Sequence, residues 1–368
     1  MSHNWNSSSK PGFKKSCMAL GLPHNSMLFA FTPDEITPCR NLPAYRRKLF
    51  SLLNGQYTVS EILVALHQAG HPCFEEQIIT DLKVLYKKKL LEDYADDISG
   101  DNYDCAFGER YSRQALFFAA REENGIAAAT KAMTILKNSH VVLFGMGGFG
   151  CHLLYEFAGC GIGKLTIVDY DRVQASNLNR QLLFREEDIG KNKIEIGRNI
   201  CTSLNSDIEY HFIQQKISSW EEMAQIIEGS DCAVLAADSP RGKIFSWMNQ
   251  AAYKCNVTTL FSLGVSAQNL RIGPMVVPGE TACFDCSMPD IGITYDDLLS
   301  RSINKRHQHG VIAPYVMTAA GLMALELLKH LTNFAPCAVY NQRLDMDLLT
   351  YQTTMVPINR RPNCPFCS

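Results

Sequence analysis

The sequence contains no apolar run close to the roughly 18 to 20 residues that a membrane-spanning helix requires. Its first residues, MSHNWNSSSKPGFKK, also lack the hydrophobic segment of a secretory signal. An excess of one charge is missing too, because 35 basic side chains are set against 37 acidic ones, for a net charge of −2. These absences give no bulk reason to expect a membrane or a nucleic acid as partner. We therefore expect a cytoplasmic protein with neither kind of partner.

Cysteine is not lacking, but its distribution argues against a disulfide scaffold. The 14 cysteines are spread over 368 residues, and the chain around them has the pattern of an α/β enzyme. We therefore expect free thiols in a reducing compartment. A hydrophobic content of 46% is ample for a packed core, and the length favours two domains, or one large domain with an appendage.

Shifts in composition divide the chain into four parts. Ser, Asn and Lys without an apolar period predict a loosely docked tail at the start, and the acidic stretch DYADDISGDNYD (93–104) predicts a linker. We expect a tail over residues 1–26, a small α+β module over 27–97, a linker over 98–108 and a large domain over 109–368.

The small module has two well-signalled helices. Ser60 is the expected N-cap of the first helix, and Phe74 begins the apolar face of the second. Short strands followed by such helices suggest a winged-helix-like unit. Three interpretations stay open: a structural extension, a DNA reader, which the few basic residues disfavour, and a docking module that adds an incoming peptide strand to its sheet edge.

In the large domain, strands and helices alternate. Apolar strands are expected at 140–144, 164–169, 208–213 and 232–238, with helices from about residue 149, around 194–204 and near 221–227. This alternation predicts an α/β fold, a doubly wound Rossmann-like sheet with right-handed crossovers.

A glycine cluster follows the first of these strands. Its residues Gly145, Gly147, Gly148 and Gly150 fit the G-x-G-x-x-G turn that lets the backbone approach a phosphate at a helix N-terminus. Asp169 ends the next strand, 24 residues beyond Gly145, where dinucleotide folds hold the ribose hydroxyls. By itself this pattern does not separate NAD, FAD and ATP.

A second, polar and cationic cluster favours one of these nucleotides. It comprises Asn177, Arg180, Gln181 and Lys193. NAD carries only a diphosphate, whereas additional cations suit a triphosphate attacked at one phosphorus, where charge builds up on the oxygens. Asp238, at the end of another strand, is placed to hold Mg²⁺. The residues therefore predict ATP together with Mg²⁺.

Two C-x-x-C pairs, Cys283 with Cys286 and Cys364 with Cys367, have the spacing that lets two thiolates of a tight turn share one tetrahedral zinc ion. The 77 residues between the pairs are more than a zinc finger contains, so the metal would tie the end of the chain to the domain. Four thiolates leave no open coordination position. We expect a structural Zn²⁺, with a redox role of either pair as the alternative.

Five segments resemble, in order and spacing, the E1-like adenylating enzymes of the MoeB, ThiF and HesA group. They are RYSRQ (110–114), GMGGFG (145–150), DYDRVQASNLNRQLLF (169–184), GKNK (190–193) and AAD (236–238), and the resemblance covers residues 109–367, about 70% of the chain. It implies that a carboxylate attacks the α-phosphorus of ATP, giving an acyl-adenylate and pyrophosphate.

Carried across residue by residue, the resemblance implies a site shared by two copies of the chain. Its residues are Asp169 for the ribose, Asn177, Arg180 and Lys193 for the phosphates, Asp238 for Mg²⁺, and Asp171 and Gln181 as further contacts of the nucleotide. Arg113 matches an arginine that reaches the phosphates of the neighbouring subunit, which implies a homodimer and makes Arg113 the fourth catalytic candidate beside Arg180, Lys193 and Asp238.

One residue of the family pattern is missing. Members that pass an activated carrier onward use a cysteine beyond the first zinc knuckle, yet residues 287–336 contain none. We therefore expect the acyl-adenylate to react directly with a nucleophile of the substrate. His307 and His309 in this segment are candidate bases, with a solvated loop as the alternative interpretation.

Without that cysteine, and with a small N-terminal module, the chain resembles the subgroup that modifies ribosomally made precursor peptides, including the enzymes of microcin C7 and pantocin A biosynthesis. The module is then similar to the PqqD-like element that recognises a leader peptide. The activated carboxylate is a Glu side chain, as in the pantocin type, or the peptide C-terminus, as in the microcin type. A sulfur-carrier adenylyltransferase, an inactive peptide-binding scaffold and an NAD oxidoreductase stay as alternatives.

Overall fold

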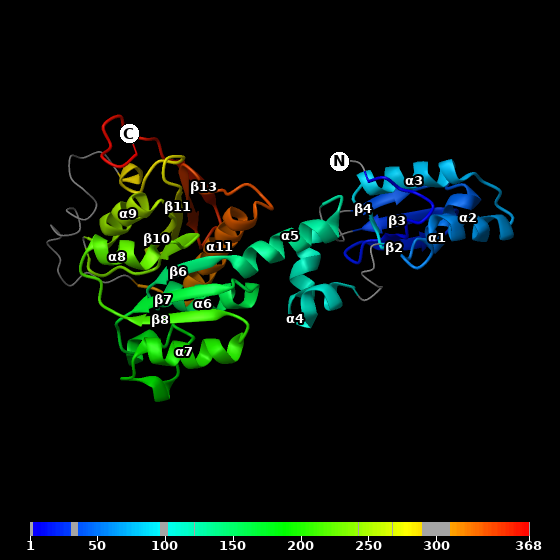
Figure 1. Cartoon of the computed structure of the whole chain (residues 1–368). Coiled ribbons are helices and arrows are strands. Elements are labelled where there is room, and N and C mark those ends of the chain that lie inside the picture. Colours follow the sequence, from blue (N-terminus) through cyan, green and yellow to red (C-terminus); the bar gives the residue numbers. More distant parts are fainter. Residues whose placement is uncertain are drawn as a thin grey trace. The chain divides into compact units, whose positions relative to one another are not determined.

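A computed structural model describes residues 3–30, 36–95, 102–120, 122–241, 243–266, 268–288 and 310–367 (Figure 1). The chain divides into two compact units, Met1–Thr134 and Ile135–Ser368. Each unit has its own cluster of buried apolar side chains.

The first unit combines a small antiparallel sheet, a two-stranded ribbon and helices. The sheet consists of β2 (Met18–Leu22), β3 (Ser26–Ala30) and β4 (Ile36–Cys39), and the ribbon of β1 (Pro11–Phe13) and β5 (Leu91–Asp93). The helices are α1 (Ala44–Leu52), α2 (Val59–Gln68), α3 (Glu75–Lys87), α4 (Asn102–Ala119) and α5 (Gly125–Asn138), which continues past the boundary of the unit.

The segment predicted as a loose tail is part of this unit's core. Trp5 is only 3% exposed and packs edge-on against the ring of Tyr86, and both β1 and β2 lie within residues 1–26. A single aromatic side chain and a three-residue strand form no period that a sequence window detects, which is why composition failed here. Similarly, α4 begins inside the stretch predicted as a linker.

Two details of the helices also differ from the prediction. Thr58, not Ser60, caps α2: its hydroxyl accepts from the N–H of Glu61, whose side chain in turn accepts from the N–H of Thr58. Phe74 does not join the apolar face of α3 but is its N-cap residue and is 81% exposed. The buried apolar face of α3 begins at Ile78 and continues with Leu82 and Leu85.

The second unit contains an eight-stranded sheet in the order β13-β12-β11-β10-β9-β6-β7-β8. Its parallel strands are β6 (His140–Phe144), β7 (Lys164–Asp169), β8 (Glu209–Gln214), β9 (Cys232–Leu235) and β10 (Thr258–Ser266). The antiparallel extension is β11 (Asn269–Val276), β12 (Gln342–Asp347) and β13 (Thr353–Pro357). The predicted Rossmann-like α/β sheet is confirmed, and the antiparallel strands were not foreseen.

Helices lie on both sides of this sheet. On one side α8 (Trp220–Ile227) and α9 (Ile244–Cys255) share a core with alternate strand residues such as Val142 and Phe144. The intervening residues Val141 and Leu143 are also buried, which requires a second cover. This cover is provided by α6 (Gly148–Cys160), α7 (Lys193–Leu204) and α11 (Ala313–Thr332).

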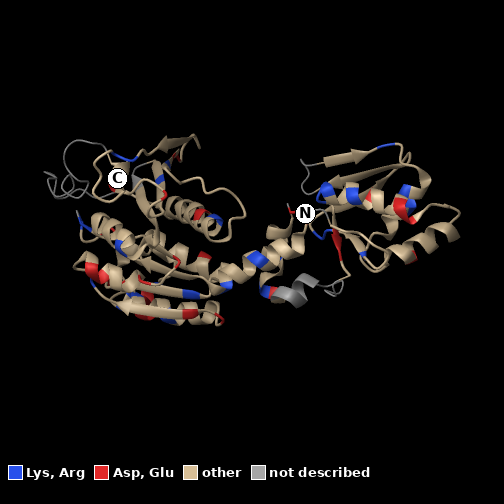
Figure 2. Cartoon of the chain, turned by 45° about the horizontal axis from the view of Figure 1, so that its top comes forward, with Lys and Arg blue, Asp and Glu red and all other residues tan. Residues whose placement is uncertain are grey.

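Strand order and charge set the conditions for a ligand site. The chain leaves β6 toward β7 and β8 on one side and returns to β9 and β10 on the other, so a crevice opens at the carboxyl ends of β6 and β9. Basic and acidic side chains are interspersed over the elements of both units (Figure 2). Within the described ranges, no helix is both long and apolar enough to cross a membrane.

Candidate active site

The glycine turn after β6 brings its backbone against the end of β9. Gly145 has φ +97°, and a Cβ there would lie 2.9 Å from the carbonyl oxygen of Ala236. A Cβ at Gly150 would overlap the carbonyl oxygen of Gly145, so α6 starts directly on the turn. At Gly147, the N-cap of α6, a Cβ would meet nothing within 4 Å. This open position at a helix N-terminus gives a phosphate room to reach backbone N–H groups.

Two aspartates after β7 have different environments. Asp169 is buried, and its carboxylate accepts from the N–H of Met146 (2.6 Å) and from the N–H of Asp171 (2.7 Å). The Asp171 side chain is 51% exposed, and its Oδ2 lies 3.3 Å from Nζ of Lys193. Asp169 therefore fixes the glycine turn, whereas Asp171 offers accessible carboxylate oxygen to a ligand.

Lys193 places a positive charge inside the protein. It is the first residue of α7, its side chain is only 4% exposed, and its N–H donates to the carbonyl oxygen of Asp171 (3.0 Å). Burying an ammonium group costs free energy unless anions and hydrogen-bond acceptors surround it. The half-exposed carboxylate of Asp171, 3.3 Å from the Lys193 ammonium group, offsets only part of that cost. The surroundings of Lys193 therefore suit an additional anion.

These features line one cavity at the crevice between β6 and β9. Residues from the ends of β6, β7, β8 and β9 enclose about 530 Å³ of space, open solvent included. From the predicted set it gathers Gly145, Gly147, Asp169, Asp171, Lys193 and Asp238. Asp238 is exposed at the end of β9 and precedes Ser239 in the cavity wall.

A second group of predicted residues lies beside this cavity without lining it. Gly148 begins α6, and the side chain of Arg180 passes within 4 Å of the place where a Cβ of Gly148 would be. The Arg180 guanidinium donates to the carbonyl oxygen of Ser176 (2.8 Å) and to Oδ1 of Asn179 (2.9 Å).

Asn177 and Gln181, from the same segment as Arg180, are both buried. Oδ1 of Asn177 accepts from the N–H of Gln174 (3.0 Å) and shapes the short helix η1 (Ala175–Asn177). Oε1 of Gln181 has no hydrogen-bond partner within the part of the chain that the structure describes. A buried carbonyl oxygen in that state suits a donor that arrives with a ligand or a moving side chain.

Of three further predicted residues, the structure describes one. Arg113 is exposed on α4, in the first unit. His307 and His309 lie outside the described residues.

Sequence reasoning missed other residues that line the cavity. Tyr170 and Ser239 line it and share a hydrogen bond between their hydroxyl groups (3.2 Å), and Gln215 follows β8. Only their position in the sequence could have indicated this role, since each follows directly after a strand of the parallel sheet or stands next to a predicted acid.

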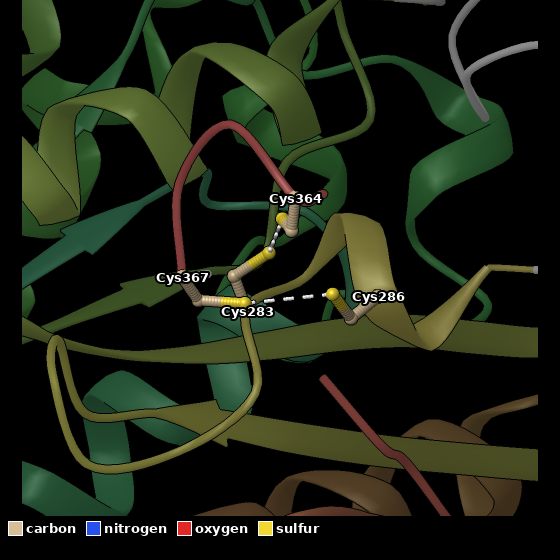
Figure 3. A group of neighbouring side chains, drawn as sticks. All are labelled: Cys283, Cys286, Cys364 and Cys367. Atoms are coloured by element: carbon tan, nitrogen blue, oxygen red, sulfur yellow. Dashed lines mark hydrogen bonds between the residues drawn. The ribbon is translucent and has the colours of Figure 1, made fainter. Parts of the chain in front are cut away.

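The four predicted metal ligands come together in the second unit (Figure 3). Sγ of Cys283 lies 3.4 Å from Sγ of Cys364, and Sγ of Cys286 lies 3.5 Å from Sγ of Cys367. These distances exclude disulfides, and all four sulfurs lie within 4.8 Å of one another. Tetrahedral zinc with about 2.3 Å bonds needs sulfurs about 3.8 Å apart, so the cluster fits Zn²⁺.

The sheet order, the glycine turn and the buried lysine define a nucleotide-binding α/β protein, and its tetracysteine cluster is consistent with a zinc site. Residues 111–366 match the ThiF family model. The chain belongs to the ThiF family, and thus to the E1-like ATP-dependent adenylyltransferases.

Curated relatives share about a quarter of their residues with it. The adenylyltransferase and sulfurtransferase UBA4 of Vanderwaltozyma polyspora is 27% identical over 301 residues, which are 79% of this chain and 64% of that protein, so the chain spans less than two thirds of it. The sulfur carrier protein ThiS adenylyltransferase of Escherichia coli is 28% identical over 260 residues, 70% of this chain and 94% of that one.

Solved structures match over nearly the whole chain. The microcin C7 biosynthetic enzyme MccB of E. coli, in complex with N-formylated MccA, has a TM-score of 0.74 at 23% identity and covers 97% of this chain and 99% of its own. MccB with ATP has a TM-score of 0.75 at 24% identity over the same shares. PaaA has a TM-score of 0.71 at 21% identity, over 94% of this chain and 99% of its own. At these identities the matches show the fold.

Proposed function

We propose that this enzyme adenylates a carboxylate of a ribosomally made precursor peptide, as one step in the biosynthesis of a peptide natural product. The observation that carries the proposal is the buried Lys193 beside Asp171, in a cavity where the glycine turn meets the carboxyl end of β9. An anionic ligand complements the buried cation, and the MccB structures with ATP and with MccA support its use on a peptide.

In the proposed reaction, the glycine turn and Lys193 hold the phosphates of ATP. We assign the ribose hydroxyls to Asp171 in place of the Asp169 expected from the sequence, because the Asp169 carboxylate is buried and already accepts from two backbone N–H groups, whereas the Asp171 side chain is 51% exposed. Asp169 then acts through the backbone that it fixes. A carboxylate oxygen of the peptide attacks the α-phosphorus, the bond to the β-phosphate oxygen breaks, and pyrophosphate leaves. Lys193 and Arg180 stabilise the negative charge that develops on the phosphate oxygens.

Mg²⁺ is the cation that the exposed Asp238 would hold. A carboxylate at the end of a parallel strand, with open solvent on one side, suits an ion that keeps most of its water. Bound there, it would supply charge neutralisation for the triphosphate. No other acid of the predicted set is placed as well, since Asp169 is buried and Asp171 pairs with Lys193.

The first unit offers the peptide an apolar sheet face. On β2 the alternate side chains of Met18, Leu20 and Leu22 are 49%, 48% and 41% exposed, and Leu20 lies in register with Leu28 of β3. Of the two edge strands, β4 carries Pro38, which has no N–H to give to an incoming strand. We therefore assign β2 and this face to the leader segment of the precursor.

A second copy of the chain completes the proposed site. Arg113 is exposed on α4 in the first unit. Its family counterpart acts on the neighbouring subunit, so we assign Arg113 to the phosphates in the partner's cavity. The absence of cysteine from residues 287–336 supports direct use of the acyl-adenylate by the peptide.

ATP–pyrophosphate exchange tests the proposal. The purified full-length protein is incubated with ATP, Mg²⁺ and peptides encoded by short reading frames beside its gene. We expect exchange only with one cognate peptide, and mass spectrometry then identifies the modified carboxylate, at a Glu side chain or at the C-terminus. Blocking each carboxylate in turn as an amide separates these two outcomes.

A sulfur-carrier adenylyltransferase is the second candidate, because the ThiS adenylyltransferase is among the curated relatives. The matched control is therefore a ThiS-like carrier protein with a free Gly-Gly end. Exchange that runs as fast with this carrier, or without any peptide, contradicts the proposed peptide substrate and favours the second candidate.

A further inference from the structure

One face of α9 meets both cysteine knuckles. Asn249 and Tyr253 are four residues apart and so lie one helical turn from each other. Oδ1 of Asn249 accepts from the N–H of Phe284 (3.0 Å), between Cys283 and Cys286. The Tyr253 ring lies 6.1 Å from the ring of Phe366, between Cys364 and Cys367.

Both side chains carry a buried hydrogen-bond donor that has no acceptor among the described residues. These donors are Nδ2 of Asn249, whose residue is 0% exposed, and the hydroxyl of Tyr253. A protein rarely buries a donor without an acceptor, so each such group calls for an explanation. Tyr253 packs against the apolar core that contains all four cysteines, so the cysteine sulfurs are the candidate acceptors.

Metal binding changes the cluster from a set of neutral thiols to an acceptor of high charge. Zn²⁺ binds thiolates, so four protons leave and the centre carries a net charge of −2. The cysteines are at most 8% exposed, so water cannot solvate this charge. Protein N–H and O–H groups must do so, and the N–H of Arg361 already donates to Sγ of Cys286 (3.3 Å).

We propose that Asn249 and Tyr253 are positioning residues of the metal centre, and that their unpaired donors bind the thiolates once zinc is present. The same two residues then fix the orientation of both knuckles from one helix. Ile244, the first residue of α9, lines the nucleotide cavity, so the helix that supports the metal also borders the ATP site. The proposal does not depend on the peptide substrate.

Tyr253→Phe is the decisive variant because it removes only the hydroxyl. The full-length protein is loaded with zinc, and the release of zinc to an excess of a metallochromic chelator is followed by absorbance. We expect the apparent zinc affinity to fall by about 10- to 100-fold, as for other hydrogen-bond partners of metal ligands. Tyr155→Phe, a tyrosine on α6, is the matched control and leaves zinc release unchanged.

Cobalt substitution gives a readout that a purely structural role would not move. In Co²⁺-loaded protein the thiolate-to-metal charge-transfer band reports the electron density on sulfur. Loss of a donated hydrogen bond in Tyr253→Phe shifts this band to lower energy, whereas Tyr155→Phe does not shift it. Asn249→Asp keeps the acceptor for the N–H of Phe284 but replaces the donor by an anionic oxygen, so we expect a larger loss of zinc than for Tyr253→Phe.

Three results would contradict the proposed role of Asn249 and Tyr253. If the hydroxyl were simply an unsatisfied buried group, its removal would leave zinc release and the cobalt spectrum unchanged or would raise the melting temperature of the loaded protein. Either outcome overturns the proposal. So does a wild-type protein that takes up neither zinc nor cobalt.

Discussion

The two units expose different chemistry, and the reason is the kind of sheet each contains. In the second unit, the parallel strands end at one edge and gather Asp171, Lys193 and Asp238 around a cavity. In the first unit, the antiparallel strand β2 presents apolar side chains at every second position. A parallel sheet brings polar side chains together at the ends of its strands, whereas an antiparallel sheet exposes apolar side chains along the length of a strand.

This contrast suggests a division of work. A point of converging charge suits a reaction at one phosphorus atom, which requires fixed geometry. A surface of half-exposed apolar side chains suits docking of a flexible chain, which gains from area more than from exact placement. Separate docking also raises the local concentration of the reacting carboxylate. Each of the following variants is chosen to separate these two roles or to show that they are not separate.

The largest expected effect belongs to Lys193→Ala. Removing the buried cation takes away charge stabilisation that is specific to the second unit, and we expect pyrophosphate exchange to fall by about 10³-fold. Binding of the cognate peptide, measured by calorimetry, stays within about twofold, because an intact first unit provides it.

Lys191→Ala is the control for this variant. Lys191 stands two positions away, is 48% exposed and pairs with Asp188 at 3.1 Å, so its loss leaves exchange nearly unchanged. Equal losses of exchange and peptide binding in Lys193→Ala would contradict the separation of the two units.

The next effect distinguishes the two aspartates within the second unit. Asp171→Asn weakens the proposed contacts to ribose, and we expect KM for ATP to rise by about 10-fold with little change in melting temperature. Asp169→Asn leaves one of two backbone N–H groups without an acceptor, which costs roughly 1–3 kcal/mol of stability. Steady-state kinetics and thermal unfolding measure both. If Asp169→Asn were fully stable and raised KM for ATP more than Asp171→Asn does, Asp169 and not Asp171 would be the ribose contact.

The third effect tests the first unit. Leu20→Asp places a charge in the centre of the apolar face, and we expect the affinity for the cognate peptide to fall by about 10-fold, the equivalent of ~1.4 kcal/mol. Exchange at saturating peptide stays unchanged, because the second unit is intact. Val64→Asp on α2, at a position that is 54% exposed, is the matched control. If the apolar face of β2 had no role in docking, Leu20→Asp and Val64→Asp would change the affinity for the peptide equally.

Sequence reasoning was most successful in the second unit. The residue types there determine the local structure. Apolar runs such as HVVLF become buried parallel strands, and the spacing of the two C-x-x-C pairs suits four sulfurs around one metal ion. The cavity residues could be predicted because parallel strands all end at the same edge. Asn249 and Tyr253 could not, since an amide and a phenol inside an amphipathic helix carry no pattern.

It was least successful where the determining contacts are distant in sequence or very local. β1 pairs with β5, some 80 residues later, and no local period announces a three-residue strand. Thr58 and not Ser60 caps α2 because Thr58 has a glutamate three positions later. Thr58 and Glu61 can therefore bond reciprocally. The direction of the Arg180 guanidinium depends on its neighbours Ser176 and Asn179, which the motif does not weigh.

The smallest expected effect compares a buried acid in the first unit with a partly buried acid in the second. In the first unit Asp81 is 6% exposed and pairs with Arg46 at 2.8 Å. In the second, Glu156 on α6 faces Gly321 of α11, and its Oε2 has no partner among the described residues. Burial raises the pKa of Glu156 to about 7. An acid with a raised pKa in the folded state destabilises the fold when it ionises, so stability falls as the pH rises from about 4.5, its ordinary value, to about 7 and then stays level.

Glu156→Gln removes this penalty. At pH 8 we expect the variant to be about 1 kcal/mol more stable than the wild type, a value well below the full pKa shift because solvent reaches part of the carboxyl group. At pH 4 the two proteins differ little, since the glutamate is protonated in both states. Asp81→Asn has the opposite sign and lowers stability at pH 8, because it breaks the pair with Arg46. Urea unfolding at the two pH values measures all three proteins, and a gain for Glu156→Gln that is equal at pH 4 and pH 8 would show that packing, not ionisation, is its cause.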